Sequence, residues 1–341
     1  MPPDAGTAVT PPMPPPGPAA EAGHPRPRLA VSSCLLGAPV RYNGGHSRDR
    51  FLTGPLSHHV DWVPVCPEME IGLGAPRPTL RLLSDGHIVN KDGSADHTRA
   101  ITKLADDRLS DIADVDGYVF KSRSPSCGLM NLPRYASGRP GERTDGQPVD
   151  RRGRGLFSDR VLSALPDLPA EEDGRLNDPN LREHFIERVF AQARLREFFE
   201  RDWRPRDLVA FHTRHKLQIL AHDPSAYRSM GRIVARAGTG DRADLEAEYR
   251  RAFAAALATR PKRGRNANAL LHVLGPLSEH LNHARRHDIV AAVESYRQGE
   301  APLSVPVALL RHHAEGEDLA YLAEQTYLDP FPADLVLRHH L

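Results

Sequence analysis

The sequence has few cysteines, few aromatic residues and no long hydrophobic segment. Only 3 of its 341 residues are cysteine, and aromatic residues make up 6%. A small, odd number of cysteines excludes a disulfide-rich secreted scaffold and is typical of reduced thiols. No run approaches the roughly 18 apolar residues of a membrane span, so we expect no membrane segment. The net charge of +1, from 45 basic and 44 acidic residues, excludes a protein that binds nucleic acid through its overall charge.

Proline is abundant, with 31 residues, and many of them lie at the N-terminus. Residues 1–27 are rich in Pro and Ala and have almost no large apolar side chains. Such a segment cannot bury enough surface to offset the entropy lost on ordering, so we expect a disordered tail. The tail also lacks the apolar core of a secretory signal. We therefore expect a cytoplasmic protein, and its length predicts about two domains after the tail.

Residues 28–175 have the pattern of an α/β domain. Short apolar runs at 29–33, 60–65 and 117–121 predict buried strands, and apolar residues at helical spacing predict a helix over 98–113. Turn signals on both sides of 87–90 predict a small hairpin. Residues 138–155 have no periodicity and are expected to form a long loop, followed by a short helix over 156–165. The order of strand, helix and strand favours a parallel, Rossmann-like sheet.

Residues 181–341 are expected to form an all-α domain, after a proline-rich boundary at 166–179. Gly and Pro separate its helical segments. Apolar residues recur at helical spacing over 185–199, 208–220, 245–257, 270–281 and 287–296.

All three cysteines lie in the α/β domain, and each follows a predicted strand. Cys34 follows 29–33, Cys66 follows 60–65, and Cys127 lies in the loop after 117–121. The carboxyl ends of parallel strands meet at one edge of a sheet, where ligands bind. Three thiols that are far apart in the sequence can therefore meet in one site.

Because the chain has three cysteines and no fourth, the sequence does not decide which metal or cluster, if any, they bind. Zinc commonly takes four ligands, often from CxxC pairs that this chain lacks, although a histidine could complete a Cys3His site. An iron–sulfur cluster normally takes four cysteines, so three would leave one iron open to a substrate. Three unrelated buried cysteines are the simplest alternative. The small, polar residues around each cysteine favour cluster ligation over core packing.

The segments around the three cysteines are VSSCLLG (31–37), VRYNG (40–44), PVCPE (64–68) with 72–74 and 76–77, and KSRSPSCG (121–128). These motifs resemble the DUF523 family, which includes thiouracil desulfidases that hold a [4Fe-4S] cluster with three cysteines. The second half of the chain contains FHTRHK (211–216), 221–222, Tyr227, 303–306, YLAEQTYL (321–328) and Pro330. These residues resemble the YbgA-like DUF1722 family.

The DUF523 resemblance implies that Cys34, Cys66 and Cys127 ligate a [4Fe-4S] cluster. It also implies that Glu68 is a catalytic acid or base and that Ser124 hydrogen-bonds the substrate or a bound sulfur. The implied reaction is the non-redox removal of sulfur from a small thiolated compound such as a thiolated nucleobase. The substrate's sulfur would bind the open iron, and water would replace it with the help of Glu68. Single-domain desulfidases of the family lack the helical half, which leaves the substrate of the fused form open.

Polar residues beside the cysteines are further candidates. Ser122 and Ser126 either bind substrate or cap their loop, and capping is also the alternative for Ser124, since serine in a turn commonly does this. Three arginines lie beside the cysteine motifs and either neutralise a negatively charged cluster, bind an anionic group of the substrate, or form surface salt bridges. These are Arg41, Arg77 and Arg123.

Two other functions remain open from the sequence. One is a nucleic-acid-associated protein with a structural cluster or zinc, in which the basic segment 260–265 of the helical domain contacts RNA. A solvated loop is the alternative for that segment. The other is a sulfur-transfer or tRNA thiolation enzyme, which the absence of a P-loop disfavours. For His212, His215 and His222 we favour structural roles over metal binding. The sequence does not determine the oligomeric state.

Overall fold

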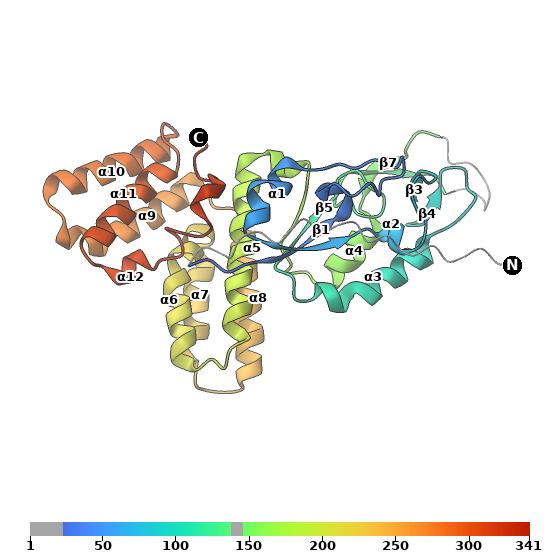
Figure 1. Cartoon of the computed structure of the whole chain (residues 1–341). Coiled ribbons are helices and arrows are strands. Elements are labelled where there is room, and N and C mark those ends of the chain that lie inside the picture. The colour runs from blue at the N-terminus through green and yellow to red at the C-terminus, as the bar shows by residue number, and fades with distance from the viewer. Residues whose placement is uncertain (1–22, 138–145) are drawn as a thin grey trace. The chain divides into compact units, whose positions relative to one another are not determined.

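The computed structural model describes residues 23–137 and 146–341 (Figure 1). The predicted disordered tail therefore lies almost entirely outside the described residues. The chain divides into two compact units: the first includes 31–107 and 120–160, and the second includes 108–119 and 161–341 together with the segment up to Ala30. Each is described by itself below. The domain limits expected from the sequence, 28–175 and 181–341, remain a prediction.

The N-terminal half is an α/β region with a parallel sheet, as predicted. Its four-stranded sheet has the order β2-β1-β5-β8. Three of these strands coincide closely with predicted ones, and the predicted helices are present as α3 and α4. The apolar runs form strands because both faces are covered; β5, for example, is buried at every position. The elements are β1 (Arg28–Ser32), β2 (Asp61–Val65), β5 (Gly117–Phe120), β8 (Ala170–Glu172), α3 (Thr98–Ile112) and α4 (Leu156–Ala164).

A second sheet was only partly expected. Its order is β4-β3-β6-β7, from Ile88–Asn90, Leu80–Leu83, Leu132–Tyr135 and Asp150–Gly153. β3 pairs with β4 antiparallel, with Leu82 opposite Ile88, so the predicted hairpin is confirmed. The prediction of a loop over 138–155 is wrong at β7, and 138–145 lie outside the described residues. β7 is polar and pairs through its backbone with β6, so hydrophobic periodicity could not reveal it.

Very short helices carry two of the cysteines. Cys34 lies in the 3-10 helix η1 (Ser33–Leu36), and Cys66 is the N-cap of α2 (Pro67–Glu70). The Cys66 N–H donates to Glu70 Oε1 at 2.9 Å, which fixes the start of α2. The other short helices are α1 (Arg50–Thr53), η2 (Pro55–His58) and η3 (Arg175–Asn177).

The C-terminal half is helical, as predicted. Asp178 and Asp223 cap the helices that begin at Pro179 and Pro224, each accepting backbone N–H bonds. Four of the expected segments belong to longer helices, whereas 270–281 extends past a helix that ends at Leu277, and α7 and α11 were not delimited from the sequence. The helices are α5 (Pro179–Phe199), α6 (Pro205–His222), α7 (Pro224–Ala235), α8 (Arg242–Ala258), α9 (Arg263–Leu277), η4 (Ser278–His280), α10 (His283–Gln298), α11 (Ser304–Gly316), α12 (Ala320–Ala323) and η5 (Ala333–Leu335). Within the described ranges, no helix is long and apolar enough to cross a bilayer.

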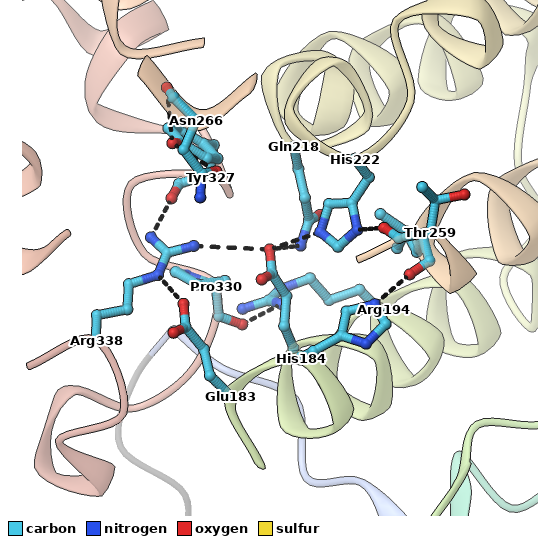
Figure 2. A network of polar contacts seen from close by, with 12 residues as sticks. Glu183, His184, Arg194, Gln218, His222, Thr259, Asn266, Tyr327, Pro330 and Arg338 are labelled. Carbon is cyan, nitrogen blue, oxygen red and sulfur yellow. Dashed lines mark hydrogen bonds and ion pairs between the residues drawn. The ribbon is translucent and has the colours of Figure 1, made fainter. Parts of the chain in front are cut away.

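A buried polar network joins α5, α6 and the C-terminal segment in the second unit (Figure 2). Glu187 is 3% exposed; its Oε1 accepts from Gln218 Nε2 at 2.8 Å and lies 3.4 Å from His222 Nε2. Arg338 lies 3.7 Å from Glu187 and donates to Glu183 and to the Tyr327 carbonyl. Burial alone would raise the pKa of Glu187, but His222 and Arg338 hold it well below its usual value. The network therefore satisfies its own charges.

Candidate functional site

A cavity of about 610 Å³ lies in the first unit, and all three cysteines line it. Cys34 and Cys127 are buried, and Cys66 is partly buried. Three segments that are far apart in the sequence thus contribute their thiols to one cavity. We expected this arrangement because each cysteine follows a predicted strand.

The environment of the thiols favours their neutral form. Burial raises the pKa of Cys66 to about 11 and that of Cys127 well above its usual value. The nearby Glu68 carboxylate raises both further. A metal that takes thiolate ligands here must therefore displace protons, as metal binding generally does.

The donor set fits an iron–sulfur cluster. Among the described residues, no group of three or more His, Cys, Asp or Glu side chains is placed to hold a single metal ion. A cluster does not need three donors to converge on one ion, because different cysteines bind different irons. Cys34, Cys66 and Cys127 also supply soft thiolate donors alone, which is the chemistry that iron–sulfur clusters select.

Glu68 lines the same cavity and is held from two sides. Its Oε1 accepts a hydrogen bond from Ser126 Oγ at 2.6 Å. Its Oε2 accepts from Arg77 Nε at 2.8 Å and also contacts the second guanidinium nitrogen. The Glu68 side chain is 13% exposed and that of Arg77 is 3% exposed. The carboxylate therefore has a fixed position on the cavity wall.

Arg77 connects the segments that follow two of the cysteines. Besides pairing with Glu68, its NH1 donates to the Val40 carbonyl at 2.9 Å and to the Gly74 carbonyl at 2.7 Å. Val40 follows Cys34, and Glu68 and Gly74 follow Cys66 in the sequence. Buried arginine is stable only when paired and hydrogen-bonded, and both conditions are met here. The sequence indicates that Arg77 lies beside the Cys66 motif, but not that it joins the segments after Cys34 and Cys66.

The Cys127 loop is organised by its serines and by a glycine. The Cys127 N–H donates to Ser124 Oγ at 3.2 Å, and the Gly128 N–H donates to the Ser124 carbonyl at 2.8 Å. A Cβ at Gly155 would lie 2.5 Å from the Ser126 backbone, so only glycine allows this approach. The Gly155 N–H in turn donates to the Gly128 carbonyl at 2.7 Å. The loop is thus held by backbone contacts that require these small residues.

The two serines of this loop have different positions. Ser124 lines the cavity, caps the turn, and has its Oγ 3.5 Å from Glu68 Oε1. Ser126 is fully buried behind Glu68 and is not among the residues that line the cavity. The loop-capping interpretation therefore describes Ser124 in this structure, and its contact with substrate remains a prediction. The expected contact of Ser126 with substrate also remains untested, whereas its bond to Glu68 is present.

Basic side chains make up much of the remaining wall. Arg41, Ser122 and Arg123 line the cavity, as expected for substrate-binding residues, and their roles remain predictions. Sequence reasoning missed three further cations there, which are Arg81, Lys91 and Lys121. Alternation offered a signal for the first, because Arg81 lies between two buried leucines of β3. Lys121 directly follows β5, at the strand end where site residues were sought.

Comparisons with known proteins agree with both resemblances. Residues 29–173 match the family model of 2-thiouracil desulfurase, and residues 216–332 match DUF1722, a family of unknown function. The chain therefore joins a desulfurase-type α/β region to a helical region. The uncharacterized protein YbgA of Escherichia coli (strain K12) is 31% identical over 153 residues, which cover 45% of this chain and 90% of YbgA. The chain belongs to the DUF1722 family, to which its C-terminal half is matched.

A solved structure is also similar to part of the chain. It is that of a [4Fe-4S]-dependent thiouracil desulfidase, TudS, which is 25% identical. The match covers 45% of this chain and 95% of that chain, with a TM-score of 0.35.

Proposed function

We propose that this protein is an iron–sulfur-dependent desulfidase that removes sulfur from a thiolated nucleobase of the thiouracil type. The observation that carries the proposal is the cavity in which Cys34, Cys66 and Cys127 lie together with Glu68. The match of residues 29–173 to the 2-thiouracil desulfurase family supports the same reaction class.

Cys34, Cys66 and Cys127 would hold a [4Fe-4S] cluster as thiolates. When bound, such a cluster supplies an iron without a protein ligand, which acts as a Lewis acid toward the sulfur of the substrate. The overall reaction is a hydrolysis: water adds its oxygen to the thiocarbonyl carbon, the C–S bond breaks, and sulfur leaves as hydrosulfide. No net oxidation or reduction occurs, so no electron donor is required.

The chain supplies the proton transfer through Glu68. Its carboxylate would accept a proton from the attacking water, as a positioned general base does. An ionised carboxylate has about four acceptor sites, so the bonds from Ser126 and Arg77 leave capacity for a water. These two bonds keep the carboxylate on the cavity wall. Arg41, Arg123 and Ser122 would orient the substrate from the other lining positions.

The test is sulfide release from 2-thiouracil by the full-length protein, reconstituted with iron and sulfide without oxygen. We expect wild-type protein to bind about four irons per chain and to release sulfide with uracil. Glu68→Gln keeps the size of the side chain and removes its charge, so it should load iron normally and lose about 100-fold or more in turnover. The matched control is Glu70→Gln on the same helix, whose amide oxygen can still accept from the Cys66 N–H.

Each part of the proposal has its own contradicting result. A protein that binds zinc and no iron would exclude the cluster. Near-normal turnover by Glu68→Gln would remove Glu68 as the base. Iron-loaded wild-type protein that releases no sulfide from any thiolated nucleobase would exclude the substrate class.

A further inference from the structure

The second unit contains a cavity of its own, which the proposed desulfidase reaction does not use. Its volume is about 600 Å³, within the range of small-molecule sites. Two of the motifs that carry the DUF1722 resemblance build much of it: 211–216 contributes three residues from α6, and 321–328 contributes four from α12 and the segment after it. Motif residues that are about 110 positions apart in the sequence thus meet around one space.

Two side chains that line this cavity each have a buried acceptor without a donor among the described residues. His215 is 2% exposed, and its Nδ1 bonds the Phe211 carbonyl at 2.8 Å, so Nδ1 carries the proton and Nε2 is an acceptor. Gln325 is 1% exposed, and its Nε2 donates to the carbonyls of Thr213 and Tyr321. Neither His215 Nε2 nor Gln325 Oε1 has a hydrogen-bond partner among the described residues. Unpaired buried polar atoms are rare, and a ligand with N–H donors would satisfy both.

Arginines and carboxylates both line the cavity. Arg194 on α5 is fixed by its bonds to the Pro330 carbonyl at 2.7 Å (Figure 2) and to His24 Nδ1 at 2.8 Å. Arg201 and Arg214 are exposed at the same cavity. The carboxylates Glu197, Glu324 and Asp329 also line it, but Asp329 is already paired with His24 and Arg311. Exposed guanidinium groups beside a cavity favour an anionic group such as phosphate.

A ladder of rings forms another part of the wall. Phe198 is stacked on Phe211 at 4.8 Å between centroids, and Phe211 is stacked on His215 at 4.1 Å. All three rings line the cavity. Such a surface suits a flat heteroaromatic ring, which gains both apolar contact and stacking. Trp203 packs against Phe198 at 6.1 Å and can report on the occupancy of the cavity.

We propose that this cavity binds a nucleoside monophosphate unit. The N–H groups of its base meet His215 Nε2 and Gln325 Oε1, its ring packs beside Phe198 and Phe211, and its phosphate pairs with Arg201 and Arg214. The unit comes either from a free nucleotide or from single-stranded RNA, because both present the same chemistry. The proposal does not depend on the desulfidase activity, since all its residues lie in the second unit.

The test uses the full-length Trp62→Phe protein, in which Trp203 is the only remaining tryptophan. Adenosine, guanosine, cytidine and uridine monophosphate are titrated separately, with Trp203 fluorescence and calorimetry as readouts. We expect saturable binding of at least one of them. Arg214→Ala and His215→Phe should each weaken it by about tenfold or more. Arg206→Ala is the matched control, because Arg206 is an exposed arginine of the same helix that does not line the cavity.

The outcomes separate the proposal from general charge attraction. No saturable binding of any of the four nucleotides or of a short single-stranded RNA would overturn it, as would equal weakening by Arg206→Ala and Arg214→Ala. Arg214→Ala changes an exposed residue, so the test stands even if His215→Phe does not fold. RNA binding that is sensitive to Arg214→Ala and much tighter than nucleotide binding identifies RNA as the source; comparable affinities identify the free nucleotide. Glu68→Gln should bind normally, which distinguishes this site from the desulfidase cavity.

Discussion

Buried polar groups serve different purposes in the two units. In the first unit, the thiols and Glu68 line a cavity, and burial raises the pKa of Cys66 and Cys127. In the second unit, the charges of Glu187 and Arg338 are satisfied by each other and by neighbouring residues (Figure 2). Burial of an uncompensated group is costly, whereas burial of a paired group is tolerated. The comparison indicates that the first arrangement is built for a ligand and the second for packing.

The backbone explains how each arrangement is reached. Cys34, Cys66 and Cys127 follow strands, so the sheet brings them together across about 90 residues of sequence. On α6, Gln218 and His222 are four residues apart, so a single helix face presents both to Glu187. Short helices and a loop that follow strands thus provide the candidate catalytic groups, and a face of a long helix contributes to the buried network.

The strongest test of the comparison is loss of the cysteines. Cys34→Ser, Cys66→Ser and Cys127→Ser should each reduce bound iron to background after anaerobic reconstitution, because a hydroxyl does not replace a soft thiolate. Iron analysis and the brown absorption of the cluster measure the effect. Full iron content in one of these variants would show that its cysteine is not a ligand.

In the second unit, loss of a buried charge should lower the free energy of unfolding. Glu187→Gln removes the carboxylate beside His222 and one of the two carboxylates beside Arg338, which keeps Glu183, so we expect the free energy of unfolding to fall by about 3 kcal/mol. Urea denaturation followed by circular dichroism measures it. Glu315→Gln on α11, which removes an exposed ion pair with Arg311, is the control and should leave the unfolding midpoint unchanged. Equal midpoints for both variants would show that the buried network does not stabilise this unit.

A smaller effect is expected from the residue behind Glu68. Ser126→Ala removes the 2.6 Å hydrogen bond to the carboxylate and leaves the charge in place, so turnover should fall by about tenfold. A positioning role also predicts an unchanged iron content and a shifted pH dependence of turnover, and rescue by Ser126→Thr would support it. Unchanged turnover with Ala would show that Arg77 alone positions Glu68.

The smallest effect is a dependence of stability on pH in the second unit. Burial, together with the charges of Arg194 and Arg214, lowers the pKa of His215 from 6.5 to about 3. The unfolded chain binds a proton at His215 below about pH 6.5, whereas the folded ring stays neutral until the pH nears 3. The stability that depends on the neutral ring is therefore complete above about pH 6.5 and is lost as the pH falls toward 3. We expect the urea midpoint to fall between about pH 7.5 and 5, and His215→Phe to reduce that fall. His184 and His212, whose pKa values are also lowered by burial, add to the fall, whereas Glu183, whose pKa burial raises to about 7, opposes it.

Local patterns were sufficient for much of the fold. Apolar runs predicted β1 and β5, which are buried at nearly every position, and also β2, an edge strand in which only Val65 is buried. Helical spacing predicted the second half as α-helical, and the strand-end positions of the three cysteines predicted one shared cavity. Each of these features depends on side chains that are close in sequence or on a rule of sheet topology, so each can be predicted from the sequence alone.

Other features depend on contacts between distant residues. Arg77 pairs with Glu68 and bonds the carbonyls of Val40 and Gly74, which no local spacing indicates. Ser126 faces Glu68 and does not line the cavity, although its motif alone suggested a contact with substrate. The reason is physical: the composition and periodicity of a segment determine which faces it buries, whereas the partner of a buried charge depends on how the segments pack together. The charged pairs and the cavity of the second unit were therefore decided by packing.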